Sequence, residues 1–303
     1  MKLRADVTLI LVLTVVCSRL SFAQKNIGSA NLTFTTIDVL GATITNVWSI
    51  NSAGQMAGTY STASDTSGHG FLYASGAFTF IDYLGADGTF ANGINDSGQI
   101  VGYAYIRGNT AAVSFIYQQN SFTTVRVPGE GDTIALGINN KGIIVGGDGP
   151  SLGGSTLGFA RIGKIFKTIA PSGGYLNVYA EAINNVGEVV GLTVGPATAF
   201  IYKNGKFQTF SVAGAVTTYV SGVNDSGIIV GSYDQCSLST CGLHGYTMLN
   251  DKYEFVDYPG ALSTAVDGVN NAGQLVGSYT LDNQVWHGFV TSPITSRDFS
   301  GNN

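Results

Sequence analysis

The sequence predicts an all-β fold, a six-bladed β-propeller made of four-stranded antiparallel blades. A short motif, clearest at residues 93–102, occurs six times at intervals of 40 to 46 residues. Each interval contains four strand-like segments. The chain is also rich in glycine and aromatic residues (42 Gly, 16 Phe and 15 Tyr), and only 11% of its residues are charged. This composition favours strands over helices.

The repeated motif predicts a β-hairpin. An apolar segment leads into Asn95, Gly98 follows three residues later, and a second apolar segment ends at Gly102. Glycine can adopt the positive φ that such a turn requires. Asparagine at a tight turn usually bonds the turn backbone, so we expect the repeated Asn to be structural. These six anchor asparagines are Asn51, Asn95, Asn139, Asn184, Asn224 and Asn270.

The remaining segments of each repeat complete a blade. In the second repeat the expected strands are 90–95, 99–105, 113–117 and 122–127. Four short strands in a meander, repeated at this period, are typical of a propeller rather than of a parallel β-helix.

The two ends of the repeat region predict how the ring closes. Segment 32–38 reads as a fourth strand with no repeat before it, whereas the last repeat stops after its third strand, 287–291. We expect 32–38 to complete the last blade, because this removes an open sheet edge that would invite pairing with another chain.

Histidine follows the same register. Each of the three His stands two residues before the aromatic residue of a third strand, and Asp occupies the facing position of the fourth strand. Cross-strand pairs of opposite charge stabilise sheets, which favours a structural role. A catalytic dyad is the alternative, but the sequence lacks a nucleophile elbow, and the three positions lie too far apart for one metal centre. The predicted pairs are His69–Asp82, His244–Asp257 and His287–Asp38.

The motif that runs through residues 69–102 begins with His-Gly-Phe-Leu-Tyr and ends with Gly-Ile-Asn-Asp-Ser-Gly-Gln-Ile-Val-Gly. It resembles the HAF family of probable extracellular bacterial repeats, and the resemblance covers residues 32–291. Residues 158–159 and 199–200 depart from the pattern because they lack the preceding His. The resemblance implies an exported protein built from repeats, and it implies no activity.

The amino terminus predicts export. Residues 1–23 combine a basic start, a ten-residue apolar run at 7–16 and small residues around a cleavage point after Ala23. An uncleaved anchor would need about 20 apolar residues, and Arg19 interrupts the run. A lipoprotein site at Cys17 is disfavoured because a bulky Val precedes it.

After cleavage, one propeller domain is expected over residues 24–293, followed by a disordered polar tail over 294–303. The whole chain has a net charge of −5, which gives no basic surface for nucleic acid. No second apolar run is long enough to span a membrane. We expect a monomer.

Two cysteines, Cys236 and Cys241, share one Ser/Thr-rich loop. In an exported protein a short disulfide is the main interpretation. A metal site is the alternative, but the second pair of Cys or His that zinc needs is not nearby. No metal or cofactor is expected.

One position of the repeat varies while its neighbours stay small or β-branched. It lies three residues before each anchor asparagine, and we call it the variable slot. Its variety fits either a ring of ligand-facing side chains or an exposed rim that tolerates any residue. Two slot residues are carboxylic, so a glycosidase-type pair at the mouth of the channel is a further possibility. The slot holds Trp48, Asn92, Leu136, Glu181, Ser221 and Asp267.

The other variable regions are the loops after the second strands and before the first strands, which a meander propeller places on one face. We call it the variable-loop face. Function on a scaffold usually occupies variable loops. The candidate contacts there are Tyr105, Arg107, Tyr175 and Trp286.

These observations predict an exported, non-enzymatic propeller that binds an unidentified polymer, glycan or protein through the variable-loop face. The alternative is a secreted carbohydrate-active enzyme, a glycoside hydrolase or lyase, that uses Glu181 and Asp267. A purely structural surface or matrix protein is a third possibility.

Overall fold

A computed structural model of the chain describes residues 32–108, 111–129, 131–149, 155–171, 177–194, 197–236 and 241–294, apart from the side chains of Cys236 and Cys241. The predicted signal peptide, Tyr175 and residues 295–303 lie outside this part of the chain.

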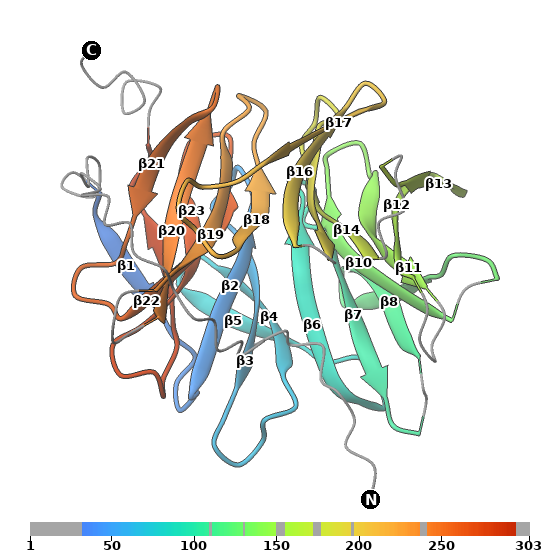
Figure 1. Cartoon of the computed structure of the whole chain (residues 1–303). Helices are drawn as coiled ribbons and strands as arrows, with labels where there is room; N and C mark the ends of the chain where they lie inside the picture. Colours follow the sequence, from blue (N-terminus) through green and yellow to red (C-terminus); the bar gives the residue numbers. More distant parts are fainter. Residues whose placement is uncertain are drawn as a thin grey trace, which may run out of the picture.

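In the described residues, 24 strands form six four-stranded antiparallel sheets that pack side by side as the blades of a six-bladed propeller (Figure 1). Blade 1 is β2 (Ile44–Ile50), β3 (Met56–Ser61), β4 (His69–Ala74) and β5 (Ala77–Ile81). Blade 2 is β6 (Ala86–Ile94), β7 (Ile100–Ile106), β8 (Ala112–Gln118) and β9 (Ser121–Val125). Blade 3 is β10 (Asp132–Ile138), β11 (Ile144–Gly149), β12 (Leu157–Ile162) and β13 (Ile165–Ile169). Blade 4 is β14 (Asn177–Ile183), β15 (Val189–Val194), β16 (Thr198–Lys203) and β17 (Lys206–Phe210). Blade 5 is β18 (Thr218–Val223), β19 (Ile229–Cys236), β20 (Cys241–Leu249) and β21 (Lys252–Val256). Blade 6 is β22 (Ser263–Val269), β23 (Leu275–Thr280), β24 (His287–Thr291) and β1 (Phe34–Ile37).

The predicted closure of the ring is confirmed. Strand β1 pairs antiparallel with β24, with Phe34 opposite Thr291 and Ile37 opposite Gly288. In Figure 1 the blue β1 accordingly lies among the orange and red strands of the carboxyl-terminal blades. The strand is shorter than the expected 32–38, but it covers the free edge of β24.

The two glycines of the motif are each required by backbone geometry. Gly98 has a φ of 72°, in the left-handed region that side chains rarely adopt. At Gly102 a Cβ would clash with the carbonyl oxygen of Phe90 and lie 3.0 Å from the ring of Phe115. The equivalent second glycine in every blade meets an innermost-strand carbonyl in the same way, at Gly58, Gly102, Gly146, Gly191, Gly231 and Gly277.

The core lies between the blades. The aromatic residue of each third strand is at most 1% exposed and packs against strands of its own and the neighbouring blade. Phe115, for example, shares a cluster with Ile81 of blade 1 and Ile100 of blade 2. Fully burying a side chain of this size contributes about 1.5–3 kcal/mol. These buried aromatic residues are Phe71, Phe115, Phe159, Phe200, Tyr246 and Phe289.

Some boundaries differ from those expected. Strand β6 begins at Ala86, four residues early, because a bulge between Ala86 and Gly88 lets it follow β7 to its end. Asn95 lies in the turn rather than in the strand, where its amide nitrogen donates to Gln99. The assignment of Ile294 to a disordered tail was wrong, since Ile294 is 8% exposed and its amide donates to the carbonyl of Gly273 at 2.8 Å. No helix in the described residues has the length and hydropathy to cross a bilayer.

Candidate functional site

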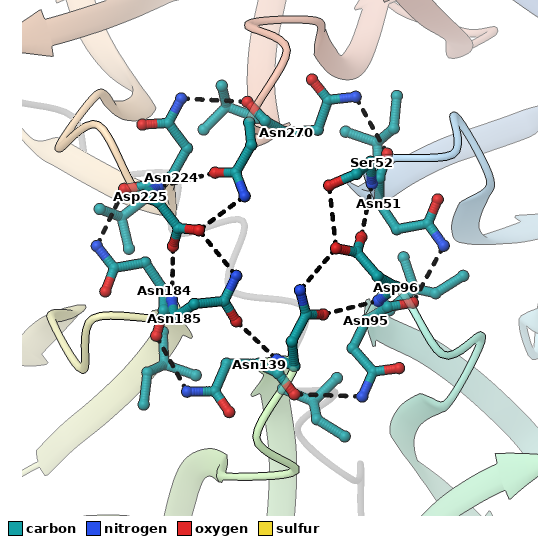
Figure 2. Close-up of a pocket in the computed structure, with 18 residues that line it drawn as sticks. Asn51, Ser52, Asn95, Asp96, Asn139, Asn184, Asn185, Asn224, Asp225 and Asn270 are labelled. Atoms are coloured by element: carbon teal, nitrogen blue, oxygen red, sulfur yellow. Dashed lines mark hydrogen bonds between the residues drawn. The ribbon is translucent and has the colours of Figure 1, made fainter.

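The anchor asparagines form a closed circle of hydrogen bonds around the axis of the ring (Figure 2). In blade 2 the Asn95 Oδ1 accepts from the amides of Ser97 (3.1 Å) and Gln99 (3.0 Å), as the sequence predicts. Its Nδ2 also donates to the carbonyl of Asn139 in the next blade, at 3.2 Å. The same inter-blade bond recurs in all six blades and closes from Asn270 to Asn51 at 3.1 Å. These side chains therefore fasten the blades together.

The residues that follow the anchors form a second, incomplete circle. Asp96 accepts from the amide and hydroxyl of Ser52 and from the Nδ2 of Asn140. Burial opposes ionisation of Asp96, but these hydrogen bonds outweigh it and lower its pKa. Together the two circles line a hollow of about 80 Å³ at the end of the channel formed by the tight turns.

The variable slot is a β-bulge in every innermost strand. In β6 the register passes from the pair Ala91–Gly102 directly to Gly93–Val101, which leaves Asn92 unpaired. A bulge bends the strand and redirects the extra side chain. The same shift isolates the slot residue in β2, β10, β14, β18 and β22. All six slot residues consequently line one cavity of about 90 Å³.

An apolar layer separates this bulge cavity from the asparagine circles. The residue before each anchor asparagine lines both cavities and is less than 10% exposed. The channel is thus stratified along its axis, with the polar bulge cavity above an apolar layer and the anchor circle below it. The apolar layer consists of Ile50, Ile94, Ile138, Ile183, Val223 and Val269.

Two carboxylic acids face the bulge cavity from β14 and β22. Asp267 is 7% exposed, and burial raises its pKa to about 7. Burial likewise raises the pKa of Glu181 to about 7. The slot carboxyls therefore lie inside the channel, and the expectation of an exposed rim or mouth does not describe Asp267. Ser221 of β18 belongs to the blade between them.

Two polar atoms at this cavity are buried without a hydrogen-bond partner among the described residues: the Oδ2 of Asp267 and the Oγ of Ser49. They belong to adjacent blades. A Cβ on Gly268 would lie 2.9 Å from the carbonyl oxygen of Trp48 and 3.1 Å from the Cα of Ser49, so the two bulges are in close contact. Buried groups of this kind are uncommon and call for an explanation.

The side-chain nitrogens of two other slot residues each donate a hydrogen bond. The indole Nε1 of Trp48 donates to the Oγ1 of Thr59 at 3.1 Å, and the Nδ2 of Asn92 donates to the carbonyl of Ala135 at 3.3 Å. Both side chains line the cavity, and the indole N–H of Trp48 is already used.

Tyr103 interacts electrostatically with Glu181, and the sequence analysis did not single it out. Burial is the main cause that raises its pKa, and the nearby Tyr105, Glu181 and Tyr179 act in the same direction. The ring of Tyr103 stacks on Phe90 with centroids 4.9 Å apart. Tyr103 of blade 2 therefore lies within electrostatic range of Glu181 and Tyr179 of blade 4.

The three predicted histidine pairs are present. The Nδ1 to carboxylate distances are 3.0 Å for His69–Asp82, 3.0 Å for His244–Asp257 and 2.7 Å for His287–Asp38. The hydrogen bond with Asp257 raises the pKa of His244. Burial opposes protonation of His69, but its bonds with Asp82 and Asp65 outweigh this effect and raise its pKa.

Each histidine also packs against a tyrosine that sequence reasoning missed. The ring centroids are 5.2 to 5.6 Å apart, and the two residues face each other across the second and third strands. A signal was available, since only these three blades carry Tyr two residues after the second glycine of the motif. The pairs are Tyr60–His69, Tyr233–His244 and Tyr279–His287.

The loop candidates do not form one cluster. Tyr105 is 38% exposed and packs edge-to-face on Phe90 and Tyr103, while the Arg107 Nε bonds the Oδ1 of Asp87 at 2.8 Å. The backbone of Trp286 instead links blades 6 and 1 through Thr43 and Thr45.

The remaining predicted sites are partly outside the description. Cys236 and Cys241 are backbone partners across β19 and β20, but their side chains lie outside the described residues, as does Tyr175. A separate groove of about 310 Å³ between blades 4 and 5 contains the Lys203–Glu188 pair, 3.3 Å apart. The described residues contain no group of three or more His, Cys, Asp or Glu placed to hold a metal.

Comparison with known proteins supports the fold. No family model and no curated protein matches the chain. Among solved structures, it is similar to XC5397 from Xanthomonas campestris, a gluconolactonase, with a TM-score of 0.53 and 12% identity over 91% of this chain and 96% of that one. It is also similar to the Hadza microbial sialidase Hz136, with a TM-score of 0.52 and 8% identity over 82% and 65% of the two chains. A prolyl endopeptidase structure gives a TM-score of 0.51 and 10% identity over 88% and 43%. At these identities the likeness concerns the fold alone.

Proposed function

We propose that this chain is an exported, non-enzymatic binding propeller whose ligand occupies the bulge cavity. The observation that carries the proposal is the bulge itself. In all six blades it takes the one variable position of the repeat out of the ladder and places it in the lining of a single cavity. A pocket with a few convergent polar groups is the usual form of a small-molecule site.

The size of the cavity bears on what binds. A volume of about 90 Å³ admits several water molecules or the head of a larger molecule. A polymer or protein partner would therefore lie on the variable-loop face and insert one group into the channel. The exposed Tyr105 and Arg107 lie on that face.

The test is a ligand screen with a cavity-filling variant. The full chain is screened by thermal shift against small amines, polyols, sugars, organic acids and metal salts, and hits are repeated in Ser221→Trp. The control is Thr79→Trp on the outer strand β5, where the side chain is exposed. We expect Ser221→Trp to abolish the shift and Thr79→Trp to keep it. The proposal would be refuted if the hits shifted the melting temperature of Ser221→Trp as much as that of the parent chain, or if the screen gave no hits.

A carbohydrate-active enzyme is the second candidate, and one observation favours it. Burial holds the pKa of both Glu181 and Asp267 at about 7, where a protonated carboxyl can act as a general acid. Glu181→Gln and Asp267→Asn would then each abolish hydrolysis of a glycan panel. Turnover that survives the double substitution would eliminate this candidate.

Export is supported by the amino-terminal sequence and by the resemblance to HAF repeats. Amino-terminal sequencing of the protein recovered outside expressing cells should begin at Gln24. Retention of the uncleaved chain inside the cells would refute this part of the proposal.

A further inference from the structure

The chemistry of the bulge cavity points to one class of ligand, and the inference rests on the binding function proposed above. The cavity contains two carboxyl groups, and none of the described residues that line it is Lys, Arg or His. The acids therefore have no basic partner within the site. An anionic ligand would be repelled, whereas a cation would supply the missing charge.

Hydrogen bonding narrows the class further. Among the described residues, neither the Oδ2 of Asp267 nor the nearby Oγ of Ser49 has a hydrogen-bond partner. The single N–H of the Trp48 indole is engaged by Thr59, and the Nδ2 of Asn92 donates to the carbonyl of Ala135. The two carboxyl groups are the acceptors of the cavity that carry charge when ionised, and a ligand that brings N–H donors can satisfy them. A primary ammonium brings three N–H groups and a positive charge.

The indole of Trp48 can supply an apolar, aromatic surface for the carbon atoms next to the ammonium group. It lines the cavity next to the bulge of β22, as the close contact between Gly268 and the Trp48 carbonyl shows. An aromatic face attracts a cation and also accommodates the methylene groups attached to it. Leu136 of blade 3, which is opposite the blade of Asp267, offers an apolar wall.

We propose that the bulge cavity binds the ammonium head of a small primary amine, with the N–H groups directed to Asp267 and Glu181 and the first carbons against Trp48. Binding is reversible and forms no covalent bond. The amine can be free or can be the end of a larger molecule that reaches the channel from the variable-loop face.

The experiment compares probes that differ in one property. Isothermal titration of the full chain uses propylammonium, the neutral propan-1-ol with the same number of heavy atoms, tetramethylammonium, which is cationic but has no N–H donor, and calcium chloride. We expect propylammonium to bind at least about 10-fold more tightly than propan-1-ol or tetramethylammonium. Equal affinity for propylammonium and either organic comparison probe, or preferential binding of calcium, would overturn the inference.

Variants locate the site. Asp267→Asn and Glu181→Gln should each weaken propylammonium binding at least about 10-fold. The control is Asp251→Asn, an exposed acid in a turn with a φ of 61°, which Asn tolerates. Unchanged binding in Asp267→Asn, with circular dichroism confirming the fold, would overturn the inference.

The two proposals fail differently. If propylammonium does not bind while another compound from the screen does and is blocked by Ser221→Trp, the amine inference falls and the binding function stands. If Ser221→Trp leaves every bound compound in place, both fall.

Discussion

Replacing Asp267 by Asn should stabilise the protein, and the gain should grow as the pH rises from about 4 to about 7. Burial raises the pKa of this carboxyl from 3.8 to about 7. In the unfolded chain the group loses its proton near pH 4. Between these values the folded state binds more protons, so the free energy of unfolding falls as pH rises. A shift of about 3 pH units corresponds to about 4 kcal/mol, present in full above pH 7.

Asn is nearly isosteric with Asp and cannot ionise. At pH 8.5 the free energy of unfolding of Asp267→Asn should therefore exceed that of the parent chain by up to about 4 kcal/mol. At pH 4 the two proteins should be about equally stable. The measurement is urea denaturation across this range without ligand. Glu188→Gln is the matched control, because Glu188 is similarly buried at 8% exposure but contacts the Lys203 ammonium at 3.3 Å. Glu188→Gln removes this contact and should be less stable than the parent chain at pH 8.5. If Asp267→Asn kept the same fall in stability with pH as the parent, the reasoning about burial would be refuted.

Three further predictions concern the circle of anchor asparagines, the closure of the ring by β1 and one histidine pair. Asn139→Ala leaves two turn amides and an inter-blade carbonyl without their partner, which should lower the free energy of unfolding by about 2–4 kcal/mol; an unchanged urea midpoint would contradict this. Deleting residues 32–38 exposes the edge of β24, so size-exclusion chromatography with light scattering should show self-association relative to the full chain, and an unchanged mass would argue against the role of β1. Asp257→Asn should lower the pKa of His244 in an NMR titration. Because the folded pKa is raised, the pair stabilises most below the ordinary His value and loses its effect as pH rises, so the substitution should cost more at pH 5.5 than at pH 8.5; an equal cost would disprove the coupling.

The fold was predictable because each motif residue answers a local requirement. Gly98 is in the turn with positive φ, Gly102 is required by the carbonyl of Phe90, and Asn95 binds the turn amides. Each of these requirements lies within one repeat and recurs in every blade. Six copies of the motif therefore predict six blades. Closure by β1 followed from counting strands, since one repeat lacked a strand and one strand lacked a repeat.

The site was predictable only in part. Sequence spacing identified the variable slot, but whether Asn92 faces solvent or the channel depends on the bulge between Ala91 and Gly93. At that bulge the strand lies against the next blade, where a Cβ on Gly93 would lie 2.9 Å from the carbonyl oxygen of Leu136. Such a contact joins residues 43 positions apart, and the only sign of it in the sequence is a small residue at position 93. The inter-blade bond of each anchor asparagine was missed for the same reason. The sequence of one turn does not reveal which carbonyl of the next blade lies beside it.

The comparison among slot residues argues that the buried acids are not there for the fold. Leu136 occupies the same bulge in blade 3, so the position accepts an apolar side chain that needs no hydrogen bond and no proton. At the equivalent bulge, burial disfavours the ionised form of Asp267, and its Oδ2 has no partner among the described residues. A polar group that lowers stability where an apolar one fits is the pattern of a functional site. The circle of anchor asparagines makes this tolerable, since it holds the six innermost strands together through identical bonds one layer away and leaves the slot free to carry unfavourable side chains.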